Sequence, residues 1–281
     1  MRTCAKKRIY TGISKCPLDF DKIIGALVVP HGLRLWEGAV GTATELETTC
    51  HAVSGSRVFP IKPFVEFAGE GGDANVSAVG YGGNKVVGRN AATFTFTLDE
   101  YYAELAKGIE NDKNGEYDVY FYDKKNVVYG VKPSSDTLMG IPLSCLFTNG
   151  APFATSGDNA TLTISFAIKD IEKMIETFDY MQCDFDVDAA AIPLDRVKLV
   201  KSGSTGVKIV EVTGDLDVTD VFAASVSSTN LKDCFTGASA ASYADGVITL
   251  TATGSVSLAE PATLYTKGVK GFEGTNSITL S

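Results

Sequence analysis

The chain is 281 residues long, 44% hydrophobic and 21% charged, with a formal net charge of −9. This composition is typical of a globular protein and excludes a disordered chain, and the acidic balance argues against a protein that coats nucleic acid with a basic face. No apolar run approaches the roughly 18–20 residues of a membrane-spanning helix, and no apolar core of a secretory signal follows the N-terminus. We therefore expect no membrane contact and a chain that is made inside a cell.

The first 20 residues are basic, with no acidic residue before Asp19. The positive charges are those of Arg2, Lys6, Lys7, Arg8 and Lys15. A segment of one charge sign often binds a surface of the other sign, and the rest of this chain is acidic. We expect the first four of these cations to contact a second copy of the chain, with a solvated tail as the alternative.

Strand and turn signals follow the basic segment. Residues 23–29 form an apolar run that ends in a Pro-His-Gly turn, and residues 38–56 are rich in Gly, Thr, Ser and Ala, which predicts a long loop and a candidate assembly loop. The glycine-rich stretches 69–72 and 80–88 lack the Gly-Lys-Ser/Thr of a phosphate loop and predict hairpin turns. Residues 90–98 alternate Thr with Phe or Leu, which is typical of a half-buried strand.

Two segments change to the helical period. Residues 97–100 open a predicted helix that runs to about Ile109, with Leu98, Tyr101, Tyr102, Leu105 and Ile109 on one stripe. Residues 168–181 place apolar side chains on one face and Lys and Glu on the other, which predicts a second helix.

Residues 115–131 predict a β-hairpin with a short polar turn that ends at Asn126, a residue type that tolerates a positive φ. Both strands carry large apolar side chains on both faces, whereas a hairpin with one wet face alternates apolar and polar residues. We expect the hairpin to be buried on both sides, either by its own domain or by a neighbouring subunit. The second possibility makes Tyr120, Tyr122 and Val128 candidate inter-subunit contacts.

Three aspartates alternate along the segment Cys-Asp-Phe-Asp-Val-Asp, and in a strand Asp184, Asp186 and Asp188 would share one face. Three such carboxylates are a weak candidate for a Ca²⁺ site, although the glycine and the later glutamate of an EF-hand loop are missing. The alternatives are a solvated strand face and an acidic stripe along a channel.

The composition changes at residues 201–206, Lys-Ser-Gly-Ser-Thr-Gly, which is typical of a linker. The strand-length runs beyond it are 207–212, 218–223, 247–252 and 255–259. Short strands separated by regular turn signals predict a small sandwich. We expect a mainly β fold with two short helices (α+β), with a tube-type β-sandwich or barrel over residues 1–201 and an Ig-like β-sandwich over residues 202–281.

Few residues suggest enzyme chemistry. His31 and His51 are the only histidines, and the six cysteines form no Cys-x-x-Cys pair, which favours free thiols. Cys50 and His51 are adjacent, and adjacent side chains in a strand point apart, so they make a poor catalytic or metal pair. We expect no enzyme activity, no catalytic residue and no cofactor.

The order of the elements resembles a known family. From about residue 61 to residue 199 come a hairpin of the type YDVYFYD…NVVYGV, a strand from Leu138, a strand at 162–166, an amphipathic helix and the segment DFDVDAAAIPLDRVKLV. This region resembles the tail-tube proteins of tailed bacteriophages and related contractile devices. A β-sandwich after it is similar to the Ig-like domain that many long-tailed phages append to the major tail protein.

The resemblance implies a virion structural protein, six copies of which form a ring whose sheets join into a continuous inner β-barrel. It implies that rings stack into a tube through long loops and an N-terminal arm, that other tail proteins are partners, and that DNA passes through the lumen without specific binding. The tail would be assembled in the host cytoplasm, and an acidic stripe at residues 184–188 fits a lumen wall. The alternatives are a head–tail connector or ring protein, a capsid-decoration protein, or a β-sandwich protein that binds carbohydrate or another surface.

Overall fold

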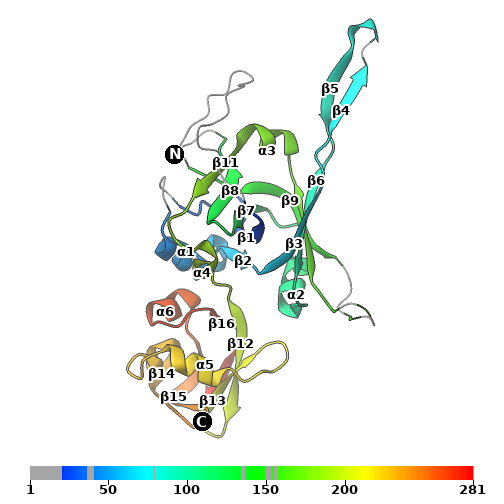
Figure 1. The fold of residues 1–281 in the computed structure, drawn as a ribbon. Coiled ribbons are helices and arrows are strands. Elements are labelled where there is room, and N and C mark those ends of the chain that lie inside the picture. Colours follow the sequence, from blue (N-terminus) through cyan, green and yellow to red (C-terminus); the bar gives the residue numbers. More distant parts are fainter. Residues whose placement is uncertain are drawn as a thin grey trace.

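The computed structural model describes residues 21–36, 41–78, 80–133, 137–149, 153–154, 157 and 159–280. The fold is mainly β with short helices, as the sequence predicts. A body carries a long projecting ribbon on one side and a smaller C-terminal unit on the other (Figure 1). None of the helices in the described ranges is long and apolar enough to span a membrane.

The body is built on antiparallel strands. They are β1 (Ile23–Pro30), β2 (Phe59–Ile61), β3 (Phe64–Gly71), β4 (Ala74–Ala78), β5 (Asn84–Arg89), β6 (Ala92–Leu98), β7 (Tyr117–Asp123), β8 (Val127–Val131), β9 (Ile141–Asn149), β10 (Thr163–Ile168) and β11 (Phe178–Gln182). One sheet runs in the order β11-β8-β7-β9-β10-β6-β3, and β1 joins it by pairing with both β7 and β2. Within the part of the chain that the structure describes, β4 and β5 pair only with each other.

Short helices lie between these strands. They are α1 (Ala43–Cys50), η1 (Ser54–Ser56), η2 (Gly80–Gly82), α2 (Ala103–Asn111), α3 (Ile171–Thr177) and α4 (Val187–Ala190), where η marks a 3₁₀ turn. The predicted loop at residues 38–56 contains α1, which Thr42 and Glu45 start with a capping box. The predicted helix at 168–181 ends earlier, because residues 178–182 pair with β8 as strand β11.

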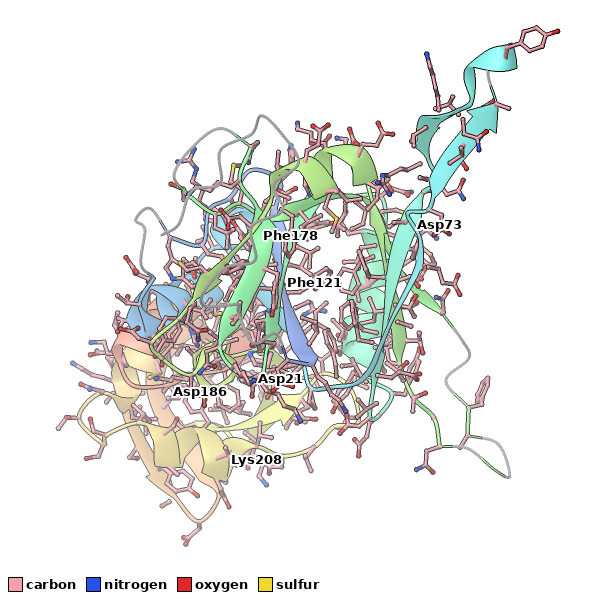
Figure 2. The ribbon with its side chains drawn as sticks, turned by 45° about the horizontal axis from the view of Figure 1, so that its top comes forward. Asp21, Asp73, Phe121, Phe178, Asp186 and Lys208 are labelled. Carbon is pink, nitrogen blue, oxygen red and sulfur yellow. The ribbon has the colours of Figure 1, made fainter. Side chains whose placement is uncertain are left out.

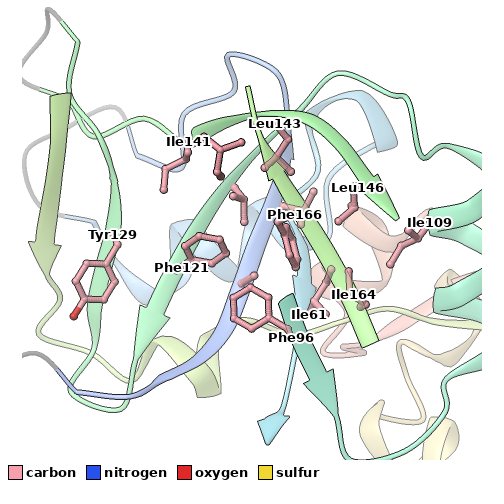
Figure 3. Close-up of a cluster of buried hydrophobic side chains, with 14 of the residues drawn as sticks. Ile61, Phe96, Ile109, Phe121, Tyr129, Ile141, Leu143, Leu146, Ile164 and Phe166 are labelled. Atoms are coloured by element: carbon pink, nitrogen blue, oxygen red, sulfur yellow. The ribbon is translucent and has the colours of Figure 1, made fainter. Parts of the chain in front are cut away.

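The two halves of the body sheet face each other across an apolar core, which gives the body its β-sandwich character (Figure 3). Phe121 on β7 lies 5.2 Å from Phe96 on β6 and 5.8 Å from Phe166 on β10, between ring centroids. Because strand side chains alternate between faces, Tyr120 and Tyr122 point the other way, into a second core under α1 and α4. β7 is therefore covered on both faces.

The C-terminal unit begins at Asp195, before the predicted linker. Its elements are β12 (Asp195–Ser202), β13 (Gly206–Glu211), α5 (Thr219–Ser225), η3 (Leu231–Cys234), β14 (Phe235–Ala244), β15 (Val247–Leu258), α6 (Pro261–Thr266), β16 (Phe272–Gly274) and β17 (Ser277–Leu280). One sheet runs β14-β15-β13-β12-β16, with β17 also paired to β15. Residues 203–205 only turn the chain between β12 and β13, so the boundary predicted between residues 201 and 202 moves to just before β12.

One predicted strand of this unit is a helix. Residues 218–223 fall mostly within α5, whose buried side chains Thr219 and Phe222 are three residues apart, the spacing of one helix face. Phe222 contacts Phe235 and Phe272, at 6.0 and 5.4 Å between ring centroids, and thereby packs the helix against the strands. The unit thus has its own core, separate from those of the body.

Candidate functional site: the projecting arm and the cleft between the two units

The hairpin of β7 and β8 is buried on both faces by its own chain. Tyr120, Tyr122 and Val128 have no exposed surface. The Tyr120 hydroxyl donates to the Leu138 carbonyl at 3.4 Å, and the Tyr122 hydroxyl donates to the Asp188 carboxylate at 2.8 Å. The predicted burial is confirmed, but the expected inter-subunit contact of these three side chains is corrected, because no surface of theirs is left for a neighbour.

A buried carboxylate holds the turn of this hairpin. Asp123 accepts hydrogen bonds from the backbone N–H groups of Lys125 at 2.8 Å, Val127 at 3.0 Å and Asp21 at 3.1 Å, and from the Tyr129 hydroxyl at 2.5 Å. Burial by itself raises the pKa of Asp123, but these hydrogen bonds to the charged form outweigh it and lower the pKa. The carboxylate is a structural anchor inside the body.

The three aspartates of the weak metal prediction do not share a face. Asp184 lies in a bend, and Asp186 caps α4 by accepting from the Ala189 N–H at 3.0 Å. Asp188, in the first turn of α4, binds the Tyr122 hydroxyl. The segment is no strand, so the predicted stripe does not form, and no cluster of three His, Cys, Asp or Glu side chains in the described part of the chain could hold a metal ion.

A two-stranded ribbon, named the arm (residues 72–90), extends β3 and β6 away from the body (Figures 1 and 2). Asp73 marks its base, where the Asn90 N–H donates to the Asp73 carbonyl at 3.0 Å. Gly71 has a φ of +80°, and a Cβ there would lie 1.9 Å from the Ala91 carbonyl oxygen, so only glycine fits where the ribbon leaves the body. The stretch at residues 80–88 contains a hairpin turn, as predicted. The turn predicted at residues 69–72 is wrong, because residues 69–71 are the end of β3 and stay paired with β6 where the ribbon leads into the arm.

Apolar side chains of the arm face solvent. Val76, Val86 and Val87 are 57%, 62% and 66% exposed, and Tyr81 at the tip is fully exposed. Lys85, near the tip, is also exposed and forms no ion pair with the described residues. Val76 and Val86 are cross-strand partners on one face, and Val87 lies on the other, so both faces of the ribbon carry exposed apolar side chains. Exposed apolar side chains that lie next to each other mark a candidate interaction surface.

The C-terminal unit is joined to the body around a buried histidine. The His51 Nδ1–H donates to the Glu47 carbonyl at 2.6 Å, and Nε2 accepts from the Gly271 N–H at 3.1 Å. The ring stacks on Tyr265 at 4.8 Å, and the Lys270 ammonium binds the Glu47 carboxylate at 2.6 Å. Burial lowers the pKa of His51 and favours the neutral ring that makes both hydrogen bonds.

A cleft of about 770 Å³ lies between the two units. Two ion pairs cross it, Arg57 with Glu273 at 2.8 Å and Arg196 with Glu104 at 3.1 Å. The wall on the body side is mostly apolar and includes Phe59, Ile61, Tyr101, Leu105, Ile109 and Tyr117. The cleft is thus a hollow with an apolar wall and charged bridges.

Two further carboxylates, Asp195 and Glu211, line the C-terminal side of this cleft. The pKa of Asp195 is raised because its surroundings partly desolvate the carboxylate and because the negative charge of Glu211 is near. Glu104 and Glu273 are paired with arginines, whereas Asp195 and Glu211 form no ion pair with the described residues. The lining as a whole holds the carboxylates Glu104, Asp112, Asp195, Glu211 and Glu273 and the cations Arg57, Lys62 and Arg196, so the cleft is negative on balance.

The remaining predicted contacts lie elsewhere. Arg2, Lys6, Lys7 and Arg8 lie outside the described residues. A carbohydrate-binding surface would need an exposed aromatic side chain. Trp36 is only 4% exposed, and its ring meets the Phe185 ring edge-on, with 6.4 Å between the centroids. Sequence reasoning missed the arm as a surface, although its valines stand between glycines with no large apolar residue to cover them.

Neither known protein families nor curated proteins match this chain. The arm and the cleft are therefore interpreted from their own chemistry.

Proposed function

We propose that this chain is a self-assembling structural protein of the tail-tube type, whose copies join into rings that stack into a tube. The observation that carries the proposal is the arm, which presents apolar side chains that its own chain leaves uncovered. Apolar surface removed from water contributes about 25 cal/mol per Å². Copies that cover the arm of a neighbour are therefore favoured over free chains.

The open edges of the body sheet support the ring. Within the described residues, β11 pairs only with β8 and β3 pairs only with β6. Val65 and Phe67 on β3 and Phe178 on β11 are exposed. Unpaired edges attract further strands, and closed assemblies of identical copies remove them.

The proposed setting is the tail of a phage, assembled in the host cytoplasm with other tail proteins as partners. The net charge of −9 supports a lumen through which DNA passes without binding, because like charges repel. No single group of acidic residues is assigned to the lumen wall, since the predicted stripe at residues 184–188 does not form.

A sizing column and negative-stain electron microscopy of the full chain test the proposal, with rings or tubes as the expected result. The matched variant replaces residues 74–89 by Asn-Gly, which can close the short gap between Asp73 and Asn90. It should keep the melting temperature of the wild type and lose the stacked assemblies. A wild type that stays monomeric at every concentration, or an armless variant that stacks equally well, would refute the proposal.

A further inference from the structure

We propose that the cleft between the two units is the receptor for the arm tip of a second copy, with Lys85 of the arm pairing with Asp195 and Glu211 of the cleft. This inference rests on the proposed self-assembly and names the two surfaces that meet. Three observations support it: the positions of the arm and the cleft in the fold, the apolar side chains on both, and their opposite charges.

The arm of a chain does not reach its own cleft. β4 and β5 project from one side of the body, whereas β2, α2 and the start of β12, which line the cleft, lie toward the C-terminal unit (Figure 1). A contact between arm and cleft is therefore made between copies. Because the two surfaces differ, the contact is heterologous, and each copy that donates an arm still offers an empty cleft to the next.

The two surfaces match in polarity. The arm presents Tyr81 at its tip with Val76, Val86 and Val87 behind it, and the body wall of the cleft presents aromatic and aliphatic side chains. Pockets of roughly 300–1,000 Å³ bury a ligand of several ring-sized groups, and the cleft volume of about 770 Å³ lies in that range. Tyr81 and the valines next to the tip of the arm are together of a size that such a cleft can bury.

The charges match as well. Asp195 and Glu211 lie close enough to repel each other, and neither forms an ion pair within the described residues although both line the cleft. Lys85 lies next to the tip and lacks an anion there. An ammonium placed beside the two carboxylates would relieve their repulsion and pair opposite charges across the junction.

Charge reversal tests the inference in the full-length protein. K85E and E211K are each expected to weaken association at least about tenfold, because each places like charges at the junction. Equal amounts of the two variants, once mixed, should assemble again, since every junction between a K85E chain and an E211K chain pairs opposite charges. Lys232→Glu and Glu260→Lys, exposed charge reversals outside the cleft, the arm and the open sheet edges, are the matched controls and should assemble like the wild type.

The outcomes separate this inference from the proposed function. If the wild type assembles but the mixed variants remain as weak as each alone, or if K85E alone has no effect, the cleft is not the receptor and the self-assembly still stands. If deletion of residues 1–20 removes assembly while K85E does not, the basic N-terminal segment is the occupant and the inference is overturned. A wild type that never associates overturns the proposed function itself.

Discussion

Two antiparallel hairpins of this chain have opposite surroundings. β7 and β8 turn at Asn126, with a φ of 61°, and β4 and β5 turn at Gly83, with a φ of 80°. The strands of the first are buried almost throughout, whereas every described residue of β4 is exposed. Both hairpins are paired by backbone hydrogen bonds, so this pairing does not determine whether a hairpin is buried. The side chains that its strands carry determine it.

The difference in side chains explains the difference in role. The body hairpin carries Tyr and Phe on both faces and needs two apolar partners, which the opposite half of the sheet and the α1 and α4 layer supply. The arm carries valine, serine, asparagine and glycine, and a two-stranded ribbon of this kind is marginal by itself in water. A hairpin with large apolar side chains on both faces therefore indicates the core of its own domain. A ribbon with only a few small apolar side chains indicates a contact between molecules.

The largest expected effect tests the body hairpin. Phe121→Ala removes a ring that contacts Phe96 and Phe166, and loss of a buried phenylalanine costs about 3–5 kcal/mol in the free energy of unfolding. Val87→Ala on the arm is the matched control and should change it by less than about 0.5 kcal/mol. Urea unfolding of both variants measures the difference, and equal effects would remove the distinction between the two hairpins.

Many strands are predictable because the pattern of apolar and polar residues along each of them is local to the segment. The alternation of residues 90–98, the apolar run at 23–29 and the two-faced hairpin each reappear as β6, β1 and the pair β7–β8. The helical periodicity of residues 168–181 overran the helix, because Phe178 and Met181 also fit a strand and the free edge of β8 was there to pair with. The hydrophobic periodicity of one segment contains no information on whether another strand, here β8, offers it a free edge.

The candidate site is less predictable, for a physical reason. The cleft is formed by α2, β2 and the first residues of β12, which are far apart in the chain, and no pattern in the sequence joins them. The arm could have been inferred from Val76, which lies between the two glycine-rich stretches, and from Val86 and Val87, which lie within the second. Turns and projecting ribbons, however, are built from the same residue types. The linker prediction failed at 201–206 because a Gly-Ser turn inside a sheet has the composition of a linker.

A smaller effect tests the turn of the body hairpin. Asp123→Asn places an amide where the carboxylate accepts from the backbone and from Tyr129, which should cost about 1.5–3 kcal/mol, the range for hydrogen bonds to a charged group. The folded pKa of Asp123 is lowered, so its contribution is complete above the ordinary aspartate pKa of about 3.9 and is lost as the pH falls through the lower folded value.

Urea unfolding of the wild type and of Asp123→Asn, from neutral pH down to roughly pH 2, measures this contribution. The gap between the two proteins should be constant near neutral pH and should narrow below about pH 4. Asp245→Asn, in the exposed turn between β14 and β15 with a φ of 51°, is the control and should give no such gap. A gap that widens in acid would contradict the role of the carboxylate as an anchor.

The smallest expected effect on stability is also the one that bears most on function. Val76→Ser changes an exposed side chain that pairs across the ribbon with Val86, so the free energy of unfolding should shift by less than about 0.5 kcal/mol.

In the unassembled protein, amides of β4 and β5 should exchange with solvent much faster than those of β7 and β8, because a lone ribbon opens without unfolding the body. Once the wild type assembles, the arm amides should become protected, and Val76→Ser should reduce that protection while the amides of β7 and β8 stay as before. If the arm amides exchange at the same rate in the assembled and the free protein, the arm is not where copies meet, whatever the stability of the variant.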